Sequence, residues 1–156
     1  MKQTIADQKV LERMAAGALC RDGFLGNDPR ELSDIIAADT AAVEAAGLSH
    51  ADVAAALSEA MARAAAGFGN LVPIRTHLAA TYIEAMGRIP SPWPGEGVFR
   101  KGELQVADQA SGRTIFATPL SIHLIAAHGF YQGRGSRYRL EPADAIALLD
   151  IAPDRK

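Results

Sequence analysis

Cysteine is nearly absent from this sequence, because its 156 residues include only one, Cys20. A lone cysteine forms no internal disulfide bond and no cysteine-based zinc site. No apolar run approaches the ~18 residues typical of a membrane-spanning helix. The first residues, MKQTIADQKVLERM, also lack the apolar centre of a secretory signal. We therefore expect a cytoplasmic protein that makes no membrane contact.

A large excess of either charge is also missing, because the formal net charge is -2 at pH 7. Binding of nucleic acid or another polyphosphate would therefore need a local basic patch. The chain has no GxSxG, SxxK, GxGxxG or HExxH motif, and no lysine follows its glycines as in a GxxxxGK[ST] phosphate loop. These absences remove the support for covalent catalysis. We expect no cofactor and no bound metal.

The composition that is present belongs to a globular protein, with 49% hydrophobic and 22% charged residues. The length suits one domain, residues 1–156. Alanine is concentrated in the first 85 residues, which favours closely packed helices. We predict an α+β fold with a helical part, residues 1–67, and a mixed part, residues 68–156. Three N-terminal helices pack on a small antiparallel sheet, and a β-hairpin and two short C-terminal helices complete the fold.

Capping residues and glycines set the expected limits of the three N-terminal helices. The first runs to about Cys20. The second is capped by Asp28 and ends at Gly47. The third follows a capping box that starts at Ser49, and it ends at Gly67.

The middle of the chain is harder to interpret. The segment HLAATYIEAM, residues 77–86, fits either a helix or a strand, and we favour the strand. The prolines of IPSPWP predict an extended linker, in which Trp93 covers the edge of the core rather than stacking on a ligand. In GELQVADQASGRTIFATP, two alternating runs flank a polar turn, which predicts a β-hairpin.

Two short helices are expected after the hairpin. Thr118 followed by proline starts a helix that reaches His128 and stops at Gly129. A last helix begins near Pro142 and buries Ile146 and Leu149.

The stretch HLIAAHGFYQGRGSRYRLEP, residues 123–142, combines two histidines, three arginines, two tyrosines and three glycines. Glycines allow tight turns that expose N–H groups, arginines donate to phosphate or carboxylate, and tyrosines can stack on a ring. This pattern is typical of an anion-recognising loop. The alternative is a solvated turn whose arginines pair with Glu141, Asp144 or Asp150. The candidate ligand-binding residues are His123, His128, Tyr131, Arg134, Ser136, Arg137, Tyr138 and Arg139.

The two histidines of this stretch lie five residues apart, which is a rotation of about 140° on an ideal helix. On that geometry they cannot hold one metal ion unless the helix distorts. His123 at the core edge, bonded to a carbonyl, and His128 in the last helical turn both have structural explanations. Ligand contact or proton transfer remains the alternative for both side chains.

Asp39 falls within the apolar stripe of the second predicted helix, where an acid needs a partner. We expect that partner to be an arginine or histidine from the C-terminal half. A structural ion pair is the first interpretation, and a supporting acid for the candidate site is the second.

Two segments, CRDGFLGNDPRELSDIIAAD and TPLSIHLIAAHGFYQGRGSRYRLEP, together resemble a family of small bacterial cytosolic proteins of unassigned function. The resemblance covers the two ends of the chain better than the middle. It implies that the HGF turn and the GRGSRYRLEP loop form one feature, and it implies no activity.

Three functions are therefore open. The first is a binding or regulatory module whose loop, residues 129–139, captures an anionic small molecule or an acidic segment of a partner. The second is a nucleic-acid-binding protein that uses the same arginines and tyrosines. The third is a small enzyme with His123 or His128 as general base.

Overall fold

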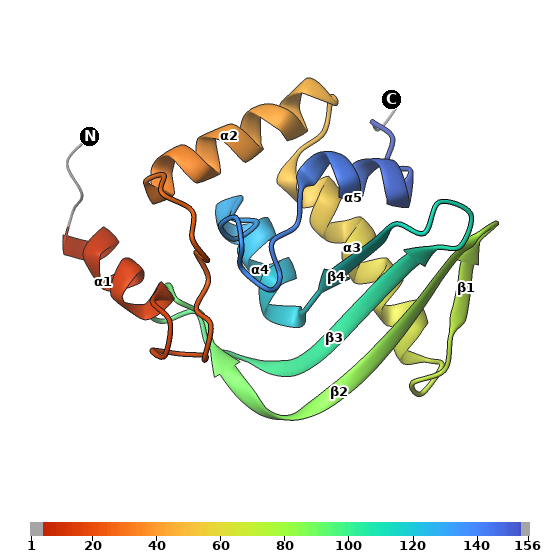
Figure 1. Ribbon diagram of the computed structural model, residues 1–156, viewed down its shortest axis with the longest axis horizontal. Coiled ribbons are helices and arrows are strands. Elements are labelled where there is room, and N and C mark those ends of the chain that lie inside the picture. The colour runs from red at the N-terminus through yellow and green to blue at the C-terminus, as the bar shows by residue number, and fades with distance from the viewer. Residues whose placement is uncertain (1–4, 154–156) are drawn as a thin grey trace.

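The computed structural model describes residues 5–153, which form five helices and one four-stranded antiparallel sheet (Figure 1). The predicted α+β class is thus confirmed. No helix in this described range is long and apolar enough to cross a membrane. In chain order the elements are α1 (Ile5–Met14), α2 (Leu32–Ala45), α3 (His50–Ala65), β1 (Val72–Arg75), β2 (Leu78–Pro90), β3 (Val98–Asp108), β4 (Thr114–Ala117), α4 (Pro119–His128) and α5 (Pro142–Leu149).

The sheet has the order β1-β2-β3-β4, and the long strands β2 and β3 form most of it. Their pairing slips between Glu84 and Arg88, where β2 has extra residues opposite Lys101. Gly87 lies in this bulge with a φ of 96°, a conformation that glycine adopts without strain. Bulges bend the strand that carries them, and both strands curve strongly beneath the helices (Figure 1).

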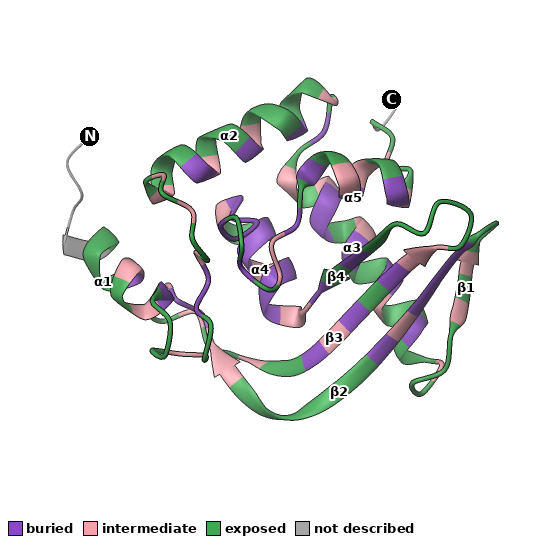
Figure 2. Ribbon diagram, viewed as in Figure 1, coloured by how far each residue is buried: buried purple, intermediate pink, exposed green. Residues whose placement is uncertain are grey.

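Two clusters of buried side chains form the core. The larger one joins the sheet to α3 and α5, and the smaller one joins α1, α2 and α4. Helix α4 contributes Ile122 and Ile125 to the larger cluster and Leu120 and Leu124 to the smaller one. It is accordingly buried over most of its length (Figure 2). The expected assignment of the whole chain to one domain stays a prediction.

Several local predictions are confirmed. The capping box of α3 forms between Ser49 and Asp52. Helix α4 runs to His128 and stops at Gly129, which has a left-handed conformation. The expected hairpin is β3–β4, and residues 78–90 form a strand rather than a helix. Trp93 packs at the edge of the smaller core cluster.

The predicted end of the first helix and the predicted start of the second are wrong. Helix α1 ends at Met14 instead of Cys20, because the chain reverses there and the carbonyl of Met14 accepts the N–H of Phe24 at 2.9 Å. Helix α2 begins at Leu32 and receives no cap from Asp28. The Asp28 carboxylate is instead bonded to Arg30 and to a distant backbone N–H.

The packing of the last helix and of the N-terminal helices also differs from expectation. Helix α5 buries Ala145 and Leu148 most deeply, while Ile146 and Leu149 are only partly covered. Among the N-terminal helices, α3 packs directly on the sheet and α2 packs against α5. Strand β1, which pairs with the start of β2, was not expected.

Candidate functional site

The predicted loop, residues 129–139, docks through backbone hydrogen bonds against the N-terminal loop, which is the segment of residues 15–31 between α1 and α2. The N–H of Gly133 donates to the carbonyl of Phe24 at 2.9 Å, and the N–H of Asn27 donates to the carbonyl of Arg134 at 3.0 Å. A Cβ atom on Gly133 would lie only 2.2 Å from the Leu25 carbonyl oxygen, so this approach requires glycine. The two segments singled out in the sequence therefore meet in space.

Arg139 is committed to the core. It binds Asp39 with two hydrogen bonds, of 2.6 and 2.9 Å, and it also donates to the carbonyl of Gln132 and to Glu141. Burial lowers the pKa of Arg139, but the hydrogen bonds from its guanidinium to the two carboxylates outweigh that effect and raise the pKa. The expected arginine partner of Asp39 is confirmed. The pair is enclosed, and neither side chain is free to hold a ligand.

Two other predicted ligand-binding residues are also buried. The hydroxyl of Tyr131 lies 3.0 Å from Nδ1 of His50, and burial raises the pKa of Tyr131. Ser136 donates its hydroxyl to the side chain of Gln132 at 2.5 Å. Both residues stabilise the loop from inside. Neither side chain faces solvent, so ligand contact at Tyr131 and Ser136 stays a prediction.

The remaining candidate ligand-binding residues of the loop are accessible to solvent. Arg137 and Tyr138 both donate to the carboxylate of Glu103 on β3, at 3.1 and 2.9 Å. The exposed side chain of Arg134 makes no hydrogen bond or ion pair with residues 5–153, although its backbone N–H donates to Asp28. The three loop arginines are thus not all paired with carboxylates, as expected from the few acids nearby.

A cavity of about 420 Å³ opens beside this loop. Its walls come from the N-terminal loop, the bent parts of β2 and β3, the start of α4 and the predicted loop. Apolar groups form most of the surface, which suits the body of a small molecule. The residues that line it are Cys20, Gly23, Phe24, Ile83, Ala85, Ile89, Arg100, Lys101, Gly102, Glu103, Thr118, Leu120, Gln132, Arg137 and Tyr138.

The charged side chains of the cavity wall are three cations and one carboxylate. Arg137 is paired with Glu103, and Arg100 is paired with Glu84 on β2 in an exposed contact of 3.3 Å. Within residues 5–153, the ammonium of Lys101 makes no hydrogen bond or ion pair. The cavity therefore has an excess of positive charge at an apolar surface.

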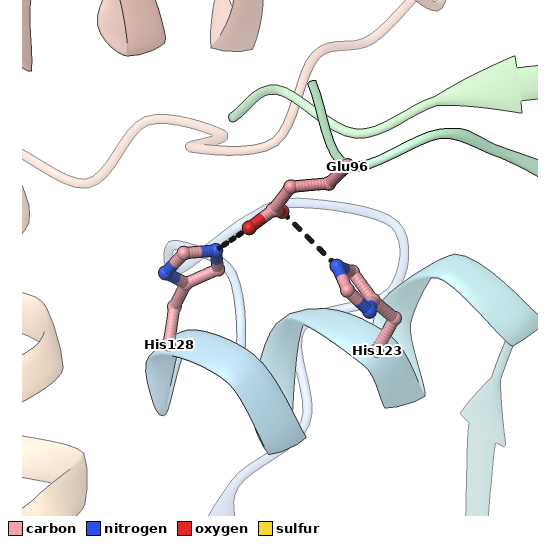
Figure 3. Close-up of side chains that lie close together, drawn as sticks. All are labelled: Glu96, His123 and His128. Carbon is pink, nitrogen blue, oxygen red and sulfur yellow. Dashed lines mark hydrogen bonds and ion pairs between the residues drawn. The ribbon is translucent and has the colours of Figure 1, made fainter. Parts of the chain in front are cut away.

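His123 and His128 lie on α4 outside the cavity, and both side chains contact one carboxylate. Their Nε2 atoms are 3.0 and 2.8 Å from the two oxygens of Glu96, which lies on the loop between β2 and β3 (Figure 3). The sequence predicted that spacing five prevents the two histidines from holding one metal ion unless the helix distorts. In the structure both side chains reach one carboxylate from adjacent turns of α4, and the three candidate ligand atoms lie within 4.8 Å of one another (Figure 3). His123 is bonded to this carboxylate and not to a carbonyl.

The loop that carries Glu96 is held in place from several sides. The hydroxyl of Ser91 donates to Glu96 at 2.8 Å, and Arg13 of α1 donates to the carbonyls of Ser91 and Pro92. The Trp93 ring stacks on His128 with 3.7 Å between ring centroids. Burial raises the pKa of Glu96, but the hydrogen bonds from the histidines and from Ser91 outweigh it and lower the pKa.

Sequence reasoning missed Glu96, Arg100 and Lys101. The two cations lie on a strand whose alternation predicted only structure. Glu96 follows the IPSPWP segment that was interpreted as a linker, and it lies between two glycines, in PGEG, as a polar group on a tightly turning loop. That signal marks an accessible carboxylate and does not indicate which residues it meets.

Comparison of the chain with protein-family models, with curated proteins and with solved structures yields no match. The family resemblance expected from the sequence stays a prediction. Function is therefore argued from the geometry of the cavity and of the histidine cluster.

Proposed function

We propose that this protein is a binding module for a small molecule that has an apolar body and one anionic group. The observation that carries the proposal is the cavity beside the 129–139 loop, in which apolar walls meet three cations and a single carboxylate. Its volume of about 420 Å³ lies within the range of ~300–1,000 Å³ common for small-molecule sites.

The apolar body would lie against Phe24, Ile89 and Leu120. Phe24 and Leu120 are buried parts of the smaller core cluster, so this wall is firm before a ligand arrives. A preformed wall lowers the entropy cost of binding.

The anionic group would lie near Lys101 and Arg137. Lys101 has no carboxylate of its own among the described residues, so a ligand carboxylate or phosphate meets no internal competitor there. Arg137 already shares Glu103 with Tyr138, which holds its guanidinium close to the cavity. A charged contact that is open to water contributes roughly 1 kcal/mol or less, so the apolar wall supplies most of the affinity.

The cavity favours a small molecule over an acidic segment of a partner, since a concave site encloses a compact ligand. The nucleic-acid alternative uses all the loop arginines and tyrosines, and two of them, Tyr131 and Arg139, make contacts inside the protein that remove them from a binding surface. We keep the cytoplasmic location expected from the sequence as part of the proposal, and cell fractionation tests it.

The test uses octanoate, a medium-chain carboxylate, and octanamide, its neutral counterpart, in calorimetric titrations. Octanoate should bind one site per chain, and octanamide should bind more weakly. Lys101→Gln should lower the affinity for octanoate by about fivefold, the equivalent of ~1 kcal/mol, and leave the affinity for octanamide unchanged. The matched control is Lys9→Gln, which removes an exposed lysine of α1 outside the cavity.

Cys20 provides a second measurement, because the only thiol of the chain lines the cavity. Octanoate should slow the alkylation of Cys20 by iodoacetamide. Equal binding of octanoate and octanamide would refute the anionic part of the proposal. Absence of both binding heat and protection would refute the cavity as a binding site.

A further inference from the structure

We propose that Glu96, His123 and His128 form a binding site for a divalent transition metal of the zinc type. This site goes beyond the proposed function, because none of the three residues lines the ligand cavity. The three residues offer two imidazole nitrogens and one carboxylate oxygen, and these atoms all lie within 4.8 Å of one another.

The distances suit a metal ion with little rearrangement. In a tetrahedral zinc site with bonds of about 2.0–2.1 Å, neighbouring ligand atoms are about 3.3 Å apart. The carboxylate oxygens of Glu96 now lie 3.0 Å from Nε2 of His123 and 2.8 Å from Nε2 of His128. Each contact would lengthen by about 0.3–0.5 Å when an ion enters between the groups. The two histidines contact different oxygens of Glu96, so the wider separations among the ligand atoms, at most 4.8 Å, would have to close toward the same spacing.

The surroundings hold the three groups in this arrangement. The hydroxyl of Ser91, itself buried, donates to Glu96, which is how carboxylate ligands are oriented in metal sites. The Trp93 ring covers His128 on one side, and the Phe99 ring lies 4.5 Å from the His123 ring. Both imidazoles are thereby restricted in rotation, so an ion would find ligands that are already positioned.

The donor set identifies the class of metal. Imidazole nitrogen suits zinc, copper, iron and nickel, whereas calcium and magnesium prefer oxygen ligands only. Among residues 5–153, the other side chain that contacts Glu96 is the Ser91 hydroxyl, so this part of the chain offers three ligands and leaves a fourth position to water or a small molecule. All three groups are partly accessible, with 21–30% of each side chain exposed, which leaves a path for the ion.

The same three side chains also have a structural explanation. An imidazole binds a metal through a deprotonated ring nitrogen, so an ion at this site would replace the hydrogen bonds between the histidines and Glu96. Without metal, the same three groups form a hydrogen-bonded cluster that links α4 to the loop. The experiment must distinguish this structural cluster from a metal site.

The test titrates Zn²⁺ and Co²⁺ into protein prepared without a histidine tag. Zn²⁺ binding is measured by equilibrium dialysis with metal analysis, and Co²⁺ binding by the visible absorption of a four- or five-coordinate ion. We expect one ion per chain at pH 7.5. Loss of an outer-shell partner lowers metal affinity by about 10–100-fold. We expect a larger loss of Zn²⁺ affinity in each of the variants Glu96→Gln, His123→Gln and His128→Gln.

The matched control is His77→Asn, which removes a histidine from the exposed turn between β1 and β2, outside the cluster. His77 has a φ of 65°, which asparagine tolerates well, so this variant should fold. Its Zn²⁺ affinity should equal that of the parent. Ser91→Ala should lower the affinity for Zn²⁺ by about tenfold and leave the stoichiometry at one ion per chain.

Nitrogen NMR of the parent protein gives a measurement that does not depend on folded variants. Zn²⁺ should shift the imidazole signals of His123 and His128 and leave those of His50 and His77 unchanged. Absence of a bound ion at 100 µM Zn²⁺ would refute the site, and so would equal affinity in the parent and the cluster variants. Shifts at His77 instead of the cluster would also refute it.

Discussion

Asp39→Ala should destabilise the fold strongly, because it leaves a buried cation without its main partner. The carboxylate of Asp39 holds both terminal nitrogens of Arg139, and the two side chains are 6% and 9% exposed. They lie 100 residues apart in sequence, so the pair ties α2 to the loop before α5. This contact joins the two halves of the chain at the base of the candidate loop.

The size of the effect follows from what remains around Arg139. Loss of one member of a buried pair typically costs ~3–5 kcal/mol. The guanidinium would keep the carbonyl of Gln132 at 2.8 Å and the carboxylate of Glu141, which is half exposed. These contacts reduce the penalty, so we expect a loss of about 3 kcal/mol, at the lower end of that range. Because the pair is shielded from solvent, salt should change the loss little.

The assay is urea unfolding at pH 7, followed by the fluorescence of Trp93, the only tryptophan of the chain. Asp39→Ala, Arg139→Leu and the double variant form a double-mutant cycle, from which the coupling energy of the pair is obtained. The matched control is Asp144→Ala, which removes the partner of Arg113 from an exposed ion pair. That control should cost less than about 1 kcal/mol.

Two results would refute this reasoning. If Asp39→Ala lost no more stability than Asp144→Ala, the buried pair would have no special energetic weight. If the two losses in the cycle were additive, Asp39 and Arg139 would act independently despite their contact, and the enclosed geometry would be wrong.

Two further predictions concern the contacts of the same loop. Burial lowers the pKa of His50, so below pH 6.5 the unfolded chain binds more protons than the folded one, and stability should fall as the pH drops from 6.5. The urea midpoints at pH 7.5 and 5.5 should differ less in His50→Gln than in the parent, and an equal difference would contradict the assignment. Gly133→Ala should lower the free energy of unfolding by about 1–3 kcal/mol and weaken octanoate binding, because the added methyl group would collide with the Leu25 carbonyl. Unchanged stability and unchanged binding would show that the two loops separate freely.

Local chemistry made part of this protein predictable from its sequence. The capping box at Ser49, the proline and glycine that flank α4 and the alternation of the β3–β4 hairpin all depend on residues only a few positions apart. Such signals act through nearby backbone groups and need no knowledge of the rest of the chain. The need of Asp39 for a basic partner was predictable for a similar reason, since its helix stripe placed it against the core.

Tertiary structure decided which distant groups meet. Helix α1 stops at Met14 because Phe24 returns to its last turn, and neither the return nor its partner can be read from the helix sequence. Glu96 lies 27 and 32 residues before the two histidines that it contacts, and its position depends on how far β2 and β3 bend before the connecting loop turns back. The sequence by itself determined the elements other than β1, though not all of their limits, and the kinds of side chain that needed partners. Only the packing of those elements around a curved sheet decided which partners they found, because contacts between distant segments depend on the whole fold.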